Sequence, residues 1–158
     1  TETRNYVKKI NGLIEKYTAK EPAGGGGSGS GGRTHPAPGY PQTSPFGYRI
    51  HPITGARRMH NGIDFGVPCG DPIIAWDDGK VGFSGWQGGY GNRVEIDHGG
   101  GLRSTLSHAI KTTVNKGDQV KGGDQVTVNG TTGSSTGRHL HFEIKKNGTY
   151  VDTKGDLP

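Results

Sequence analysis

The sequence predicts a mainly β fold, built from short antiparallel strands joined by glycine-rich turns. The chain has 158 residues, of which 31 are glycine and only 28% are apolar, so we expect little helix and a thin core. Residues 93–97 alternate polar and apolar side chains, residues 98–101 can turn, and residues 102–108 can return as a second strand. We therefore expect an antiparallel β-sheet or sandwich that carries a groove.

Three segments of the chain differ in composition. Residues 1–20 place their apolar side chains on one helical stripe, which predicts a short helix that we interpret as the end of a preceding domain. Residues 21–36 are rich in glycine and serine and predict a flexible linker. Residues 37–158 carry the strand and turn signals and form the domain in which we expect function. The helical stripe consists of Tyr6, Val7, Ile10, Leu13, Ile14 and Tyr17.

The charge of the chain is moderately basic, at +5. Its lysines and arginines are scattered rather than clustered into a stripe, so a nucleic acid partner is not expected. A basic surface also suits an anionic bacterial wall, or it serves solubility alone. No apolar run approaches the ~20 residues that a membrane span needs.

The strongest chemical signal is the sequence His-Leu-His-Phe-Glu-Ile at residues 139–144. If this segment is a strand, alternation places His139, His141 and Glu143 on one face and the three apolar residues on the other. Upstream, His60 and Asp64 are four residues apart and share a face on either a helix or a strand. Both pairs could therefore present their polar groups to one ion.

These side chains suit a zinc site with one open position. Imidazole and carboxylate are zinc donors, and catalytic sites typically use three protein ligands with the fourth place left to water or substrate. His108 is a fifth candidate, since it shares a strand face with Leu106 at the end of the predicted return strand. Two histidines would then be free to move protons. Each motif alone is more often a surface or hydrogen-bonded pair; their coincidence with glycine-rich segments favours the metal site.

Four motifs together resemble the lysostaphin-type family of peptidoglycan endopeptidases, in the family's order and across residues 37–158. They are residues 46–55 (Phe-Gly-Tyr-Arg-Ile-His-Pro-Ile-Thr-Gly), residues 60–65 (His-Asn-Gly-Ile-Asp-Phe), residues 89–92 with 96–99 (Gly-Tyr-Gly-Asn and Ile-Asp-His-Gly), and residues 133–143 (Gly-Ser-Ser-Thr-Gly-Arg-His-Leu-His-Phe-Glu). The resemblance implies a zinc endopeptidase that cleaves wall peptides at glycyl-glycine bonds or after D-alanine.

The resemblance also implies the role of each site residue. His60, Asp64 and His141 would hold one zinc ion, and His108 and His139 would be the catalytic histidines that are not ligands. The lone histidine of the family commonly follows Tyr-x and precedes Leu, whereas His108 lies in Leu-Ser-His-Ala. Leucine cannot donate a phenolic hydrogen bond, so we expect altered packing or substrate preference rather than loss of activity.

Substrate contacts and biological setting are the least constrained predictions. Asn92 and Tyr90 are candidate substrate-binding residues, although a polar strand end and core packing explain them equally well. Residues 3–7 (Thr-Arg-Asn-Tyr-Val) resemble the end of lysozyme-like domains of phage tails, which implies an extracellular, tail-associated lysin with other tail proteins as partners. The alternative function is a catalytically silent module of the same fold that binds peptidoglycan or activates a partner.

Overall fold

The computed structural model describes residues 29, 31–50, 53–133 and 139–158, and these residues form a mainly β domain as predicted. The predicted helix in residues 1–20 lies outside the described residues. The elements are β1 (Gln42–Ser44), β2 (Gly47–Ile50), β3 (Arg57–His60), β4 (Ile63–Phe65), β5 (Pro72–Ile74), β6 (Gly79–Trp86), η1 (Gly88–Tyr90), β7 (Asn92–Gly99), β8 (Leu102–Thr112), β9 (Gln119–Val120), β10 (Gln125–Asn129), β11 (Leu140–Lys146), β12 (Thr149–Val151) and η2 (Lys154–Asp156).

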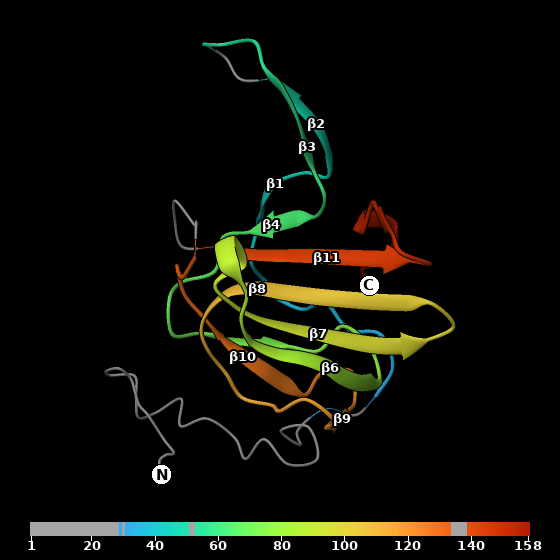
Figure 1. The fold of residues 1–158 in the computed structure, drawn as a ribbon. Helices are drawn as coiled ribbons and strands as arrows, with labels where there is room; N and C mark the ends of the chain where they lie inside the picture. Colours follow the sequence, from blue (N-terminus) through green and yellow to red (C-terminus); the bar gives the residue numbers. More distant parts are fainter. Residues whose placement is uncertain (1–28, 30, 51–52, 134–138) are drawn as a thin grey trace.

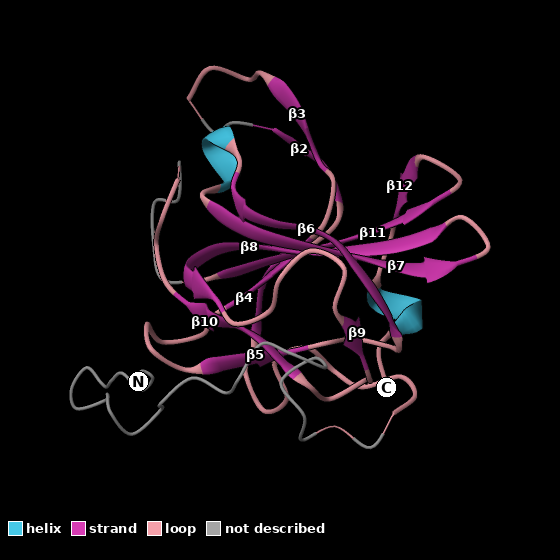
Figure 2. Cartoon of the chain, turned by 60° about the horizontal axis from the view of Figure 1, so that its bottom comes forward, coloured by secondary structure: helices cyan, strands magenta, loops and turns pink. Residues whose placement is uncertain are grey.

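The main sheet is antiparallel and is organised around its longest strand, β8. Its strands follow the order β1-β4-β11-β8-β7-β6-β9, with β12 beside β11. The predicted hairpin is confirmed, because β7 and β8 pair directly across the turn at Gly99–Leu102 (Figure 1). The end of β8 also pairs with β10, which in turn pairs with β5 (Figure 2).

Strand alternation determines which side chains enter the core. On β11, Leu140, Phe142 and Ile144 are fully buried in the apolar cluster, whereas His141 and Glu143 point to the opposite face. Trp76 is also fully buried, and its Nε1 donates to the carbonyl oxygen of Asp156 at 2.9 Å. The predicted division of β11 into an apolar face and a chemical face is therefore confirmed.

The β2–β3 hairpin stands away from the main sheet (Figure 1). Its register pairs Gly47 with His60, so the hairpin begins and ends beside the main sheet while its arms extend outward. Tyr48 and Ile50 are largely exposed on it. The hairpin thus projects from the main sheet next to His60.

Part of the predicted linker lies along the domain. The backbone N–H of Thr34 donates to the carbonyl oxygen of Trp76 at 2.7 Å, and its hydroxyl donates to Ala75 at 2.6 Å. The guanidinium of Arg33 lies 4.6 Å from the centre of the Trp76 ring. Residues 33 and 34 are therefore in contact with the domain, while the predicted boundaries at residues 20 and 36 stay predictions. The described part of the chain contains no helix that is both long and apolar enough to cross a bilayer.

Candidate metal centre and active site

His60, Asp64 and His141 meet where β3, β4 and β11 come together. His141 lies directly opposite Asp64 in the register of β4 and β11. Its Nδ1 is 2.8 Å from Asp64 Oδ1, and His60 Nε2 is 3.3 Å from Asp64 Oδ2. One ligand atom from each residue lies within 4.8 Å of the others. The predicted convergence of these three side chains is confirmed.

The way in which His60 reaches Asp64 differs from the expectation of one helix or one strand. His60 ends β3 and Asp64 lies in β4, with a tight turn between the two strands. A Cβ atom on Gly62 would lie 2.3 Å from the carbonyl oxygen of Phe142. Only glycine lets this turn approach β11 so closely. The four-residue spacing brings His60 and Asp64 together because the chain changes direction between two strands. The sequence pattern alone did not distinguish this arrangement from a single helix or a single strand.

Hydrogen bonds orient the two imidazole rings. His60 Nδ1 lies 2.7 Å from the carbonyl oxygen of Pro45; a carbonyl only accepts, so Nδ1 carries the proton and the Nε2 lone pair faces Asp64. His141 directs Nδ1 to Asp64 and Nε2 to Glu143 Oε2, both at 2.8 Å. Histidines that bind metals almost always engage their second nitrogen in this way. The donor set of two imidazoles and one carboxylate fits zinc with a fourth position open.

Close contact between the carboxylates and the imidazole rings shifts the pKa values of Asp64 and His141 in opposite directions. Burial would raise the pKa of Asp64, but hydrogen bonds with His141 and His60 outweigh it and hold that pKa well below its usual range. Burial likewise disfavours the charged ring of His141, yet the carboxylates of Asp64 and Glu143 raise the pKa of His141 to about 9.

His108 reaches the site through a β-bulge. Along β8, Leu106 pairs with Val94 but Ala109 pairs with Asn92, so β8 carries one extra residue at this point. His108 has a backbone φ of 68°, which lies in the left-handed region that residues other than glycine rarely adopt. Leu106 consequently lies in the core while His108 lies in the cavity beside His141. The predicted shared face of Leu106 and His108 is wrong, because the bulge turns the strand between them.

The five predicted polar residues line one cavity of about 300 Å³. The ring centres of His108 and His139 are 5.4 Å apart, and those of His108 and His141 are 6.1 Å apart. His108 Nδ1 lies 2.8 Å from the carbonyl oxygen of Thr132, so its Nε2 is the nitrogen without a backbone partner. The cavity is lined by His60, Asp64, Gly89, Tyr90, His108, His139 and His141.

The two candidate substrate residues lie in different positions. Tyr90 lines the cavity, and its ring stacks beside that of His141 with centres 6.4 Å apart. The side-chain amide of Asn92 instead donates to the carbonyl oxygens of Ala109 at 3.3 Å and Ile110 at 2.8 Å. Asn92 therefore ties β7 to β8 just beyond the bulge, and its substrate role stays a prediction.

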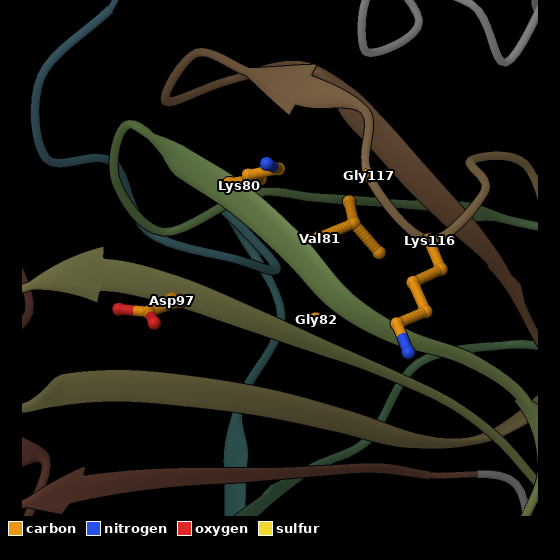
Figure 3. Close-up of a pocket in the computed structure, with 6 residues that line it drawn as sticks. All are labelled: Lys80, Val81, Gly82, Asp97, Lys116 and Gly117. Atoms are coloured by element: carbon orange, nitrogen blue, oxygen red, sulfur yellow. The ribbon is translucent and has the colours of Figure 1, made fainter.

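A second hollow, of about 450 Å³, lies on the surface around β6 and the turn after β8. Its lining includes Lys80, Asp97 and Lys116 (Figure 3). Lys80 of β6 and Lys116 of the segment between β8 and β9 point in different directions, so their charges do not meet at one point. This hollow therefore lacks the convergence of donor atoms that marks the first cavity.

Sequence reasoning missed the buried partner of Glu143. Arg93 Nη2 lies 3.1 Å from Glu143 Oε1, and both side chains are buried. Opposite charges at inward positions of two predicted strands could have suggested the pair, but the order of the strands was required to bring them together.

Two imidazoles and one carboxylate, in a cavity that two further histidines share, are the arrangement of a metal-dependent hydrolase on an antiparallel sheet. The comparison with known families agrees with this class. The family model described as Peptidase family M23 matches residues 58–153, and the chain belongs to that family.

Relatives and solved structures support the same assignment. The chain is 44% identical over 110 residues to the DD-carboxypeptidase/endopeptidase Mpg of Neisseria meningitidis serogroup B, covering 70% of the chain and 25% of that relative. A zinc-containing peptidase of Vibrio cholerae superposes with a TM-score of 0.73 at 38% identity, covering 81% of the chain and 40% of that structure. The catalytic domain of lysostaphin from Staphylococcus simulans gives 0.67 at 34% identity, with 75% and 92% covered. The chain spans about a quarter of the length of the curated relatives it matches.

Proposed function

We propose that residues 37–158 form a zinc-dependent endopeptidase that hydrolyses peptide cross-links of bacterial peptidoglycan. The observation that supports this most directly is the convergence of His60, Asp64 and His141 within 4.8 Å in a cavity that His108 and His139 also line. The three converging residues would hold one zinc ion. When bound, zinc lowers the pKa of water toward about 7 and polarises a peptide carbonyl.

His108 and His139 would carry the protons of the reaction. Burial lowers the pKa of His108, so its ring is neutral near pH 7. Its Nδ1 proton is donated to the carbonyl oxygen of Thr132, which leaves the Nε2 lone pair to accept a proton from water. His139, across the cavity from His108, would then stabilise the developing oxyanion and help to protonate the leaving amine.

The substrate bond that we favour follows D-alanine. Two relatives carry names that state this chemistry: the DD-carboxypeptidase/endopeptidase Mpg and the peptidoglycan DD-endopeptidase ShyB of Vibrio cholerae, which is 40% identical over 111 residues. Tyr90 offers an aromatic surface at the cavity, and Trp86 of β6 is largely exposed nearby in the sequence. These rings suit contact with the flat peptide groups of a wall stem peptide.

We propose two settings in which such an enzyme would act outside the cell, as a bacterial wall enzyme or as a phage tail lysin. The phage setting, with tail proteins as partners, rests on residues 1–20 alone, which lie outside the described part of the chain. The names of the relatives Mpg and ShyB refer to bacterial enzymes. Both settings have the same substrate, and the proposed chemistry is the same in each.

Digestion of purified walls with different cross-links tests the proposed function. We expect new amino groups to be released in a chelator-sensitive way, with product masses that place the cut after D-alanine in directly cross-linked walls. Cuts confined to glycine bridges would contradict the proposed cleavage after D-alanine but would agree with zinc-dependent peptide hydrolysis. Binding to walls with no release of amino groups would instead identify a silent module of the same fold.

A further inference from the structure

Glu143 is a buried carboxylate that does not line the cavity. Its residue is 1% exposed, and it lies two positions after His141 on the same face of β11. A charged group in such a place is costly unless it is paired and fully hydrogen-bonded. Its partners therefore indicate what the fold uses it for.

Three groups fix both oxygens of Glu143. Oε1 accepts from the hydroxyl of Thr105 at 2.8 Å and from Arg93 Nη2 at 3.1 Å. Thr105 lies directly opposite Glu143 in the register of β8 and β11. Oε2 is left for His141 Nε2, at 2.8 Å. The carboxylate is thus anchored by two neighbouring strands, with one oxygen directed at the candidate zinc ligand.

This anchoring determines which nitrogen of His141 is available to a metal. A carboxylate accepts, so the Nε2 that faces it carries a proton. The neutral ring then has its lone pair on Nδ1, which faces Asp64 at 2.8 Å. Hydrogen bonds to the second nitrogen of a ligand histidine fix its tautomer and increase its basicity.

Arg93 links the same carboxylate to the wall of the cavity. Its Nη1 donates to Gln87 Oε1 at 2.6 Å, and its guanidinium lies 4.3 Å from the centre of the Tyr90 ring. Tyr90 in turn stacks beside His141. One buried arginine therefore contacts the carboxylate behind His141 and two residues of the segment around η1. Its planar group can serve these partners together, whereas a lysine cannot.

We propose that Glu143 is the positioning residue that fixes the Nε2–H tautomer of His141, and that Arg93 couples this carboxylate to Tyr90 of the cavity wall and to the neighbouring Gln87. The proposal rests on the proposed function, since it assigns His141 to zinc. It adds two residues that act through a ligand rather than on substrate.

The test measures zinc affinity by competition with a chelating dye, together with the tautomer of the neutral His141 ring in the zinc-loaded protein by nitrogen NMR. E143Q should weaken zinc binding by about 10- to 100-fold and make the tautomers mixed, because an amide can also direct its NH₂ at Nε2. The matched control is E95Q. Glu95 is a partly buried carboxylate on β7 that pairs with Arg103 at 3.6 Å rather than with a site histidine. E95Q should retain the affinity and tautomer of the wild type.

Two further variants keep the proposal testable if E143Q does not fold. T105V removes one hydrogen bond to Glu143 with little change in shape and should weaken zinc binding by about two- to tenfold. R93K should raise the KM for wall peptides more than it lowers kcat, because Tyr90 in the cavity wall loses its contact with the Arg93 guanidinium. Unchanged affinity and tautomer in folded E143Q or T105V would overturn the proposal even if the wild type hydrolyses walls. Wild-type protein that binds zinc but releases nothing would instead count against the proposed function.

Discussion

Two histidine-containing clusters in this domain have similar ingredients and different geometry. At one end of the sheet, His141 and His60 direct ring nitrogens at the two oxygens of Asp64. Elsewhere, His98 lies between the carbonyl oxygen of Asp78 at 2.6 Å and the hydroxyl of Ser104 at 2.7 Å, with its ring edge-on to Trp76. Both ring nitrogens of His98 are thus engaged in hydrogen bonds within the domain.

The comparison teaches that convergence, rather than histidine content, marks the functional site. The carboxylate of Asp78 instead accepts hydrogen bonds from the backbone N–H groups of Gly32 and Gly122, so it holds two loop segments together. In the part of the chain that the structure describes, the group of His60, Asp64 and His141 is the one whose ligand atoms could share an ion.

Replacing His139 by alanine should lower kcat by about 10²- to 10⁴-fold, because a proton-transfer group is removed from the cavity. Zinc content should stay at the wild-type value, since His139 is not among the three converging residues. The measurement is amino-group release from walls, with zinc quantified on the same sample. An unchanged rate would exclude the proposed role of His139, and lost zinc would assign it to the metal instead.

Replacing His98 by alanine should affect stability but not chemistry. Two hydrogen bonds and an edge contact with Trp76 are lost, so the free energy of unfolding should fall by about 1–3 kcal/mol. The kcat of the folded fraction should stay within about twofold of the wild type, because distant sites act independently. Denaturant titration and initial rates measure the two quantities. A folded H98A protein with strongly reduced kcat would erase the contrast between the clusters.

The smallest expected effect is a difference in pH dependence in the presence of a chelator. The carboxylates around His141 raise its pKa to about 9, above the ordinary 6.5, so its contribution to stability is complete below pH 6.5 and is lost as the pH rises toward 9. Burial lowers the pKa of His98, so its contribution is complete above pH 6.5 and is lost as the pH falls.

Thermal unfolding of metal-free protein between pH 5 and 10 can separate the two histidines. H141Q should flatten the alkaline side of the stability curve relative to the wild type, and H98Q should flatten the acidic side. The same slope change in both variants would mean that the two clusters do not differ electrostatically as the structure indicates.

Local pattern and family motifs predicted much of the fold and of the site. Alternation assigned Phe142 to the core and His141 to the chemical face, and the turn at residues 98–101 lies between β7 and β8 as expected. These features depend on neighbours in sequence, so a single chain is enough to reveal them.

Features that depend on contacts between distant strands were not predictable in the same way. The bulge that moves His108 out of the core follows from a register shift against β7, and no residue type at that position announces it. The pairing of Arg93 with Glu143 requires the order β11-β8-β7 in the sheet. The projecting β2–β3 hairpin is likewise a matter of tertiary placement rather than of strand propensity.

Zinc binding by the wild type and by D64A shows whether His60, Asp64 and His141 hold a metal ion. Competition with a chelating dye, with near-ultraviolet circular dichroism as the check on folding, should give one zinc ion per wild-type chain and greatly weakened binding in folded D64A. A folded wild-type protein with no affinity for zinc, or a D64A protein that binds it as tightly as the wild type, would contradict the account.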